Sequence, residues 1–366
     1  MESKPVMLQI VQHLKPGGIE TMVLDLQRFL SDFDVHIVSI EGDRETALAG
    51  WERLRGVSDR LHFLNKPPGF QLSTMKQLAT LMRDMRAEWI HTHHIGPLMY
   101  GGLAARMAGH LPLIHTEHDA WHLERAKNRR MQRALIWLTK PTLVADAQLV
   151  ANNCKRFLPG SQYHLIPNGI DTDRFQAGDR EAARLQFGLP TDTPLVGCAA
   201  RLETVKGVDQ LIEAIAKTPN HIHVALAGQG SQRAALEQRA TNLGIMDRVH
   251  FLGGVNDMPA FYRSLDLFCL ASHQEGLPLS PLEAQSTGVP CVLTDVGGSK
   301  EAVCPKTGTL VSDGDIDGLA RAITDTLKNE RTESPREFVL EHGNVVRMTA
   351  AYLALKNTAY GQGKHA

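Results

Sequence analysis

Two patterns of apolar and polar positions alternate along this chain. Short apolar runs rich in Val, Ile and Leu recur along almost its whole length, as in strands that a parallel sheet buries on both faces. The segments between these runs repeat their apolar positions every three or four residues, which is the spacing of amphipathic helices. Strands that alternate with helices predict an α/β fold built on parallel sheets.

The pattern breaks once and then restarts, which predicts two domains. Before the break, strands are predicted at 7–11, 35–40, 61–64, 89–92, 113–116, 142–145 and 164–166, with helices that include 20–30, 73–86 and 97–108. After it, strands are predicted at 195–199, 223–227, 249–252, 267–270 and 290–293. The break at 171–194 follows the turn Pro167-Asn168-Gly169. A length of 366 residues suits two α/β domains, and such domains bind ligands at the carboxyl ends of their strands, here in a cleft between facing domains.

The amino-acid composition limits the classes of protein to which this chain can belong. Hydrophobic residues make up 43% and charged residues 22% of the chain, as in soluble globular proteins. The 39 Lys and Arg balance 40 Asp and Glu, for a net charge of −1, which argues against a surface built wholly for nucleic acid. The five cysteines are scattered without a C-x-x-C pair. We therefore expect a reduced, cytoplasmic protein with no signal peptide and no spanning helix.

Two features beside predicted strands are suited to bind an anion. Gly17-Gly18 follows the first strand and precedes a helix, whose free N–H groups and positive dipole end favour a phosphate. Arg201 and Lys206 follow the first strand of the second half and offer a guanidinium fork and an ammonium group to a diphosphate. A plain turn and two solvated charges are the alternative interpretations.

Residues 272–298 combine acidic and turn-forming residues in a short span. Glu275 and Glu283 lie on either side of a turn and a helix start. Because one carboxylate can accept hydrogen bonds from two hydroxyl groups, Glu283 is a candidate for binding a ribose and Glu275 for binding a sugar ring. The closely spaced Gly and Pro residues argue against a merely solvated helix face. Gly228-Gln229-Gly230 also follows a strand, but Arg233 replaces the third glycine of a dinucleotide fingerprint, which leaves a phosphate-side or structural turn.

Five motifs, in this order, resemble those of one family. They are KPGGIE near the start, HTEHD at 115–119, IPNGIDTDRF at 166–175, AARLETVKG at 199–207 and the Glu-x7-Glu segment. From about Met7 to Asp317 the chain is similar to the retaining, nucleotide-sugar-dependent glycosyltransferases of family four (glycosyl transferases group 1), which have the GT-B fold. The resemblance implies two facing Rossmann-like domains: an acceptor-side domain at 1–170 and a donor domain at 171–343. It also implies a C-terminal helix at 344–366 that packs on the first domain.

The resemblance also implies roles for individual residues. Arg201 and Lys206 would hold the donor diphosphate, and Asn256 or Val255 would contact the base. His118 would lie near the reacting sugar carbon, where it could hydrogen-bond the sugar and steady the positive charge that grows there. The residues implied in catalysis are His118, Arg201, Lys206 and Glu275, and those implied in donor binding are Gly17, Gly18, Arg201, Lys206, Asn256, Glu275, Gly276, Leu277 and Glu283.

A metal site is the alternative for the histidine-rich and acidic segments. The run His91-Thr92-His93-His94 lacks the Asp that follows in metallo-hydrolases, and no further ligand set has metal spacing. Asp171-Thr172-Asp173 matches an Asp-x-Asp metal motif, but the same triplet recurs at Asp32, Asp313 and Asp315 and so has little specificity. We expect no metal and no other cofactor.

Residues 121–140 are a basic segment within a neutral chain. The segment contains six basic residues and one acidic residue, Glu124, which gives a local charge of +5. The basic residues are Arg125, Lys127, Arg129, Arg130, Arg133 and Lys140. Trp121 and Trp137 belong to the same segment. An interfacial helix of this kind can attach to an anionic membrane. A solvated basic helix is the alternative.

Together these features predict a metal-independent, retaining glycosyltransferase. We expect a UDP-linked sugar donor and a hydroxyl of a lipid-linked or polysaccharide acceptor, in cell-envelope or exopolysaccharide synthesis at the inner face of the cytoplasmic membrane, and no nucleic-acid partner. The alternatives are a nucleotide-sugar epimerase on the same two-domain plan and a non-catalytic nucleotide-sugar-binding subunit. The donor base, the sugar and the acceptor stay open.

Overall fold

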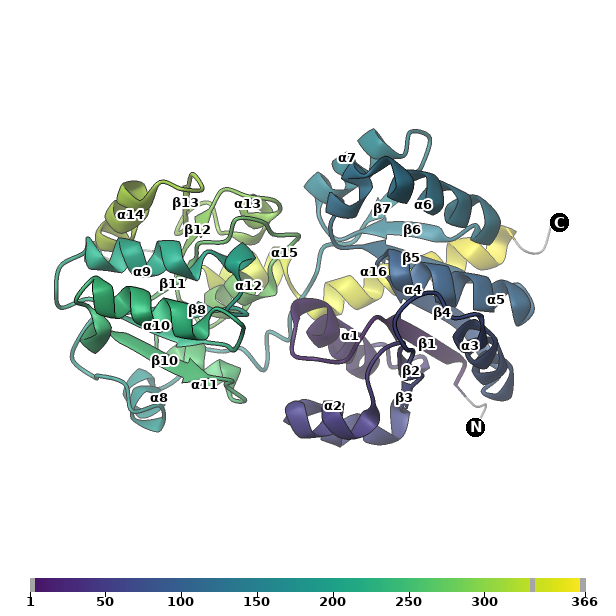
Figure 1. Ribbon diagram of the computed structural model, residues 1–366, viewed down its shortest axis with the longest axis horizontal. Helices are drawn as coiled ribbons and strands as arrows, with labels where there is room; N and C mark the ends of the chain where they lie inside the picture. Colours follow the sequence, from purple (N-terminus) through teal and green to yellow (C-terminus); the bar gives the residue numbers. More distant parts are fainter. Residues whose placement is uncertain (1–3, 330–332, 363–366) are drawn as a thin grey trace. The chain divides into compact units, whose positions relative to one another are not determined.

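The computed structural model describes residues 4–329 and 333–362, with side chains described as far as Leu355. The chain forms two compact units. The first runs to Asn168 and takes in the segment from Val345, whereas the second is Gly169–Asn344. In Figure 1 the first unit is purple to teal with a yellow final helix, and most of the second is green. The sequence places the corresponding limits at 170 and 343.

The first unit is a parallel sheet covered by helices. Its described strands pair in the order β3-β2-β1-β4-β5-β6-β7, and every pair is parallel. The strands are β1 (Val6–Val11), β2 (Asp34–Ser39), β3 (Leu61–Phe63), β4 (Ala87–His93), β5 (Leu113–Glu117), β6 (Thr142–Ala145) and β7 (Tyr163–Leu165). The helices are α1 (Gly18–Phe29), α2 (Arg44–Gly50), η1 (Glu52–Arg60), α3 (Leu72–Asp84), α4 (Ile95–Pro97), η2 (Leu98–Gly102), α5 (Leu103–Met107), η3 (Trp121–Glu124), α6 (Ala126–Thr139), α7 (Gln148–Phe157) and α16 (Val345–Gln362). The strand order reverses between β1 and β4, which is where such sheets bind ligands.

The second unit repeats this architecture. Its described strands pair in parallel in the order β10-β9-β8-β11-β12-β13. They are β8 (Leu195–Ala199), β9 (His223–Ala227), β10 (Val249–Gly253), β11 (Leu267–Leu270), β12 (Cys291–Thr294) and β13 (Thr309–Val311). Its helices are α8 (Arg180–Gln186), η4 (Thr204–Lys206), α9 (Val208–Ala216), α10 (Arg233–Asn242), η5 (Met246–Arg248), α11 (Met258–Arg263), α12 (Leu279–Ser286), α13 (Ser299–Ala302), α14 (Ile316–Lys328) and α15 (Arg336–His342).

The predicted α/β architecture with parallel sheets is confirmed, with differences in detail. The sequence pattern missed β13, a three-residue edge strand that is only partly buried and therefore lacks an apolar run. The predicted helix at 97–108 begins earlier, at Ile95, and contains the π-helical segment η2. Such π segments insert an extra residue into a turn, which a regular helical spacing cannot reveal.

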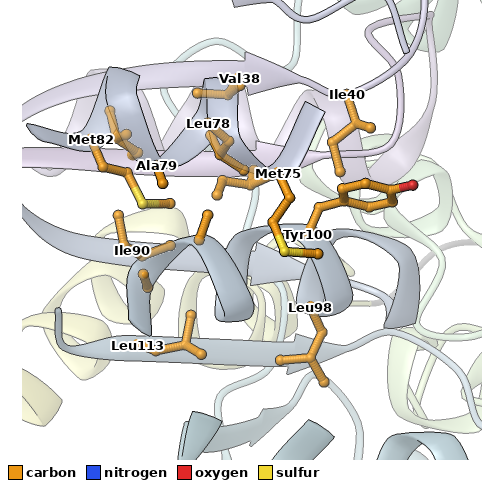
Figure 2. Packing of buried hydrophobic residues seen from close by; sticks show 14 of the residues in the cluster. Val38, Ile40, Met75, Leu78, Ala79, Met82, Ile90, Leu98, Tyr100 and Leu113 are labelled. Carbon is orange, nitrogen blue, oxygen red and sulfur yellow. The ribbon is translucent and has the colours of Figure 1, made fainter. Parts of the chain in front are cut away.

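Apolar packing between α3 and the sheet fixes the first unit. Met75, Leu78, Ala79 and Met82 lie at helical spacing on one face of α3 and are buried. Figure 2 shows them against side chains of the neighbouring strands and of the α4 to α5 segment. Each fully buried Met or Leu side chain contributes about 1.5–3 kcal/mol, so the sheet gives a rigid base to the residues at its carboxyl edge. Within residues 4–329 and 333–362, no helix is both long enough and apolar enough to cross a membrane.

Candidate functional site

In the second unit, the loops after β8 and β11 hold Lys206 and Glu275 against each other. Lys206 Nζ donates a hydrogen bond of 2.7 Å to Glu275 Oε1. Ser272 Oγ donates to the same oxygen at 2.6 Å. Glu275 is only 7% exposed, so its charge needs these partners. The structure thus brings together two residues that the sequence assigns to the donor, and adds Ser272, which the sequence pattern did not indicate.

Two glycines allow these loops to meet. Gly207 has φ +57°, and a Cβ there would lie 1.9 Å from the carbonyl oxygen of Ala271. Gly297 has φ +54°, and its Cβ would lie 1.7 Å from the carbonyl oxygen of Glu275. Only glycine combines a left-handed backbone with such close approach. The position of Lys206 relative to Glu275 therefore depends on backbone packing as well as on the ion pair.

The turn Gly228-Gln229-Gly230 supports the loop that holds Arg201. A Cβ on Gly228 would lie 1.9 Å from the carbonyl oxygen of Ala200, and Leu202 N donates to Gln229 O at 2.9 Å. Of the two interpretations that the sequence left open, the structure supports a structural turn. Arg201 itself is exposed at the carboxyl end of β8.

Glu283 is fixed from a different element. It lies in α12, is 8% exposed, and accepts a 2.6 Å hydrogen bond at Oε2 from the hydroxyl of Tyr262 in α11. Burial, together with this carboxylate, raises the pKa of Tyr262 far above its usual range, so the hydroxyl keeps the proton that it donates. Leu277 is buried in the same segment, Gly276 O accepts from Gly298 N at 2.8 Å, and Asn256 is exposed after β10.

In the first unit, the helix after Gly17-Gly18 already has a carboxylate at its N-terminus. A Cβ on Gly17 would lie 2.4 Å from Glu20 Oε2, and Glu20 Oε1 is 3.3 Å from His13 Nδ1. The hydrogen bond with Glu20 raises the pKa of His13. A negative group is favourable at this end of a helix. Glu20 thus places a negative charge beside the position that the sequence predicts for an anion, where it would repel a phosphate.

His118 lies within a row of buried polar side chains at the carboxyl edge of the first sheet. Its Nδ1 is 2.8 Å from Asp146 Oδ2, and its Nε2 is 3.1 Å from His93 Nδ1. The Nε2 of His93 is in turn 2.8 Å from Gln9 Oε1, and Asn168 Nδ2 donates to Asp146 Oδ2 at 2.8 Å. Both ring nitrogens of His118 therefore have protein partners, which the sequence did not indicate.

A second network lies beside the first. Glu117 Oε1 accepts from His115 Nε2 at 2.9 Å and from Gln132 on the inner face of α6. Burial raises the pKa of Glu117, but the charge and hydrogen bond of His115 outweigh it and lower the pKa to about 2. Glu117 therefore stays ionised although it is buried. On the other side, Thr116 Oγ1 lies 2.8 Å from His91 Nε2 and 3.0 Å from the Tyr352 hydroxyl of α16.

The acidic residue that suggested a metal makes hydrogen bonds within the protein. Within the described part of the chain, no group of three or more His, Cys, Asp or Glu side chains is placed to hold a metal ion. Asp171, the first residue of the Asp-x-Asp triplet, accepts from the backbone N–H groups of Asp173 and Arg174 at 3.1 and 3.0 Å. It is therefore a turn-forming residue.

The basic segment forms η3 and α6 and divides into two faces. Leu135 and Gln132 face inward and are buried. Outward lie exposed residues that we call the α6 basic face: Lys127, Arg130, Arg133, Trp137 and Leu138. Trp137 is 76% exposed. Arg129 differs, because its guanidinium donates to Leu123 O and Glu124 O at 2.8 Å each and so holds the start of the helix.

Two family models together match most of the chain. Residues 179–340 match the model described as Glycosyl transferases group 1, and residues 16–174 match Glycosyltransferase Family 4. A D-inositol 3-phosphate glycosyltransferase of Mycolicibacterium smegmatis is 33% identical over 66% of this chain and 60% of its own length. A GDP-mannose-dependent alpha-(1-6)-phosphatidylinositol monomannoside mannosyltransferase of the same organism is 29% identical over 80% of this chain and 78% of its own. The chain thus spans about three fifths of the length of the first of these relatives.

Solved structures share the fold along nearly the whole chain. Anabaena Alr3699/HepE in complex with UDP and glucose has a TM-score of 0.85 at 23% identity, over 97% of this chain and 100% of that one. Sucrose-phosphate synthase from Thermosynechococcus elongatus has a TM-score of 0.82 at 20% identity, over 98% and 100%. At such identities the likeness concerns the fold alone, and it confirms the predicted GT-B class.

Proposed function

We propose that this chain, which belongs to the group 1 glycosyltransferases of family four, transfers a sugar from a nucleoside diphosphate donor to an acceptor hydroxyl group. The observation behind the proposal is the Lys206–Glu275 pair, with Glu283 on the helix that follows. An ammonium group suits the diphosphate, and carboxylates held by Ser272 and Tyr262 suit sugar hydroxyl groups. A nucleotide sugar needs both kinds of partner.

In this proposal catalysis rests on charge stabilisation. The bond from the anomeric carbon to the diphosphate oxygen breaks, and Arg201 and Lys206 stabilise the negative charge that grows on the leaving phosphate. The acceptor hydroxyl forms the new bond from the same face of the sugar and passes its proton to that phosphate. The configuration is retained without a side-chain nucleophile. Because protein cations balance the phosphate charge, no metal is required.

The nature of donor and acceptor is part of the same proposal. A UDP-linked donor is proposed; Alr3699/HepE binds UDP in a protein of the same fold, whereas the name of one relative specifies GDP-mannose. A lipid-linked or polysaccharide acceptor of the cell envelope is supported by the phosphatidylinositol mannoside in that name. Both assignments go beyond family membership, because they name the class of donor and the class of acceptor.

One assay separates this function from its rivals. The protein is incubated with UDP-linked and GDP-linked sugars, labelled in the sugar, and with a lipid extract, with and without EDTA. We expect label on a lipid or glycan acceptor from a single donor class, at the same rate after chelation. An epimerised donor would indicate an epimerase, and donor binding without any product would indicate a binding subunit. Activity that EDTA abolishes and Mg²⁺ restores would overturn the metal-independent mechanism.

The α6 basic face is proposed to attach the protein to the inner face of the cytoplasmic membrane. Its bases provide charge for an anionic headgroup layer, at about 1 kcal/mol for each base near the surface. Trp137 and Leu138 are exposed beside these bases and suit the interfacial region. This location would bring the enzyme to a lipid-linked acceptor.

A further inference from the structure

The row Gln9, His93, His118 and Asp146 restricts how many protons its two imidazole rings hold. Three hydrogen bonds join the four side chains in series. Each needs one proton. Gln9 presents its oxygen to His93 while its amide nitrogen faces the Met7 sulfur at 3.8 Å, and an ionised Asp146 can only accept. With the Gln9 amide in this orientation and Asp146 ionised, all three protons come from the two rings.

Two neutral imidazole rings supply only two N–H groups. Three hydrogen bonds that end on acceptors at both sides therefore require a third proton, and the ring pair has one positive charge. The pair is buried, with His93 1% and His118 5% exposed. A buried charge is costly without a partner, and the Asp146 carboxylate at 2.8 Å is that partner. Asn168 holds the same carboxylate oxygen.

The charge belongs on His118, because this ring touches the carboxylate and His93 is one ring further away. Burial by itself lowers the pKa of His118, but the charge and the hydrogen bond of Asp146 outweigh it and raise the pKa above its usual value. Burial, together with the neighbouring histidines, lowers the pKa of His93 well below that value. The two directions agree with the proton count. The titratable groups around His118 are His91, His93 and His94 at the end of β4, His115, Glu117 and Asp119 along and after β5, His122 in η3, and Asp146 after β6.

We propose that Asp146 is a positioning residue that keeps His118 doubly protonated, so that His118 acts in the proposed glycosyl transfer as a fixed cation. The functional half of this inference rests on the proposed function, whereas the protonation does not. A cation repels the positive charge that grows at an anomeric carbon, so the role that the resemblance implies for His118 changes sign. His118 suits an oxygen of the donor instead, which its Nε2–H would take in exchange for the neutral His93.

Histidine-selective isotope labelling and NMR of the ligand-free, full-length protein test the protonation. The His118 ring signal is assigned by its loss in His118→Gln. We expect the wild-type ring to titrate above a free imidazole, and Asp146→Asn to lower its pKa so that the ring is neutral at pH 7. Asp146→Glu should restore the high value. Asp34→Asn is the matched control, because it removes a carboxylate beside another histidine, His36, and should leave His118 unchanged.

The pH profile of sugar transfer tests the use of the cation. Turnover at saturating substrate should fall as pH rises through the pKa of His118, and in Asp146→Asn this fall should occur at lower pH, with about tenfold less protonated enzyme for each unit of pKa lost. A wild-type ring that titrates at or below a free imidazole, or one that Asp146→Asn leaves unchanged, overturns the proposal. If the ring behaves as expected but the profile of Asp146→Asn matches that of the wild type, the catalytic half is overturned. The titration needs no donor, so it is decided even if the protein transfers no sugar.

Discussion

Among single residues, Lys206 and Arg201 have the same predicted role but different surroundings. Lys206 is paired with the buried Glu275, whereas Arg201 is exposed. Replacing either by Ala should cost about 2–4 kcal/mol of transition-state stabilisation if both stabilise the leaving diphosphate. Only Lys206→Ala should also lower the free energy of unfolding, by about 1–3 kcal/mol, because it leaves a buried carboxylate with one partner fewer. Steady-state kinetics and chemical unfolding measure the two effects.

A double-mutant cycle separates the two roles of Lys206. In the Glu275→Gln background the loss of stability on Lys206→Ala should shrink, because no buried charge is left unpaired, while the loss of phosphate stabilisation should persist. Near-wild-type turnover of Arg201→Ala or Lys206→Ala would remove that residue from the mechanism. If Arg201→Ala and Lys206→Ala lowered the free energy of unfolding equally, that result would contradict the argument from burial, because only Lys206 is paired with a buried carboxylate.

The sequence indicated candidate residues beside strand ends but not the side chains that hold them. Glu275 and Lys206 were found because motifs place them beside strand ends. Tyr262, Asp146 and Ser272 were not found, although each fixes a candidate side chain. Tyr262 is 21 positions from Glu283, and Asp146 is 28 positions from His118. Such pairs form only when separate elements meet, and no local pattern records them. One signal was available for Asp146, since it directly follows a predicted strand at the edge where ligands bind.

At the scale of elements, buried apolar runs gave the clearest prediction of strands. Strands buried on both faces, such as β8 and β11, appear as uninterrupted apolar runs and were predicted with their observed limits. The edge strand β13, of which only Val311 is buried, and the helix α2, which has no buried residue, leave no such signal. The edge strands β3, β7 and β10 were nevertheless predicted to within one residue of their observed limits, so an edge position does not by itself hide a strand.

Helix α6 permits a test of membrane attachment that leaves its fold intact. Arg130→Glu with Arg133→Glu reverses two charges of the α6 basic face without touching Arg129, which holds the helix start. We expect cosedimentation with anionic vesicles to fall in this variant, to weaken with rising salt in the wild type, and to fall also in Trp137→Ala. Binding is measured on vesicles with and without phosphatidylserine.

The control for α6 is a charge reversal of equal size elsewhere in the first unit. Arg55→Glu with Lys76→Glu changes two exposed bases of η1 and α3 and should leave vesicle binding near the wild-type level. Equal losses in the two double variants would indicate a response to net charge alone. Unchanged binding by Arg130→Glu with Arg133→Glu would return α6 to the alternative of a solvated basic helix.

In the whole molecule, the chain leaves the first unit at Asn168 and returns to it at Val345. The returning helix α16 packs against α1, and its Tyr352 is 3% exposed and reaches the Thr116 hydroxyl of β5. The second unit has its own sheet and core, and α16 is not part of it. The stability of the first unit therefore depends on a segment that follows the second unit in sequence.

Tyr352→Ala should consequently destabilise one unit and spare the other. Removing a buried aromatic ring costs about 3–5 kcal/mol, whereas Tyr352→Phe, which keeps the ring and loses the hydrogen bond with Thr116, should cost about 1 kcal/mol. Hydrogen exchange followed by mass spectrometry reads the two units separately. We expect protection in Tyr352→Ala to fall across β1, β4 and β5, where the ring packs against His91 with centroids 4.9 Å apart, while peptides of β8, β9 and β11 keep their wild-type protection. Equal loss of protection in both sheets would show that the two units unfold as one, and that α16 stabilises the molecule as a whole.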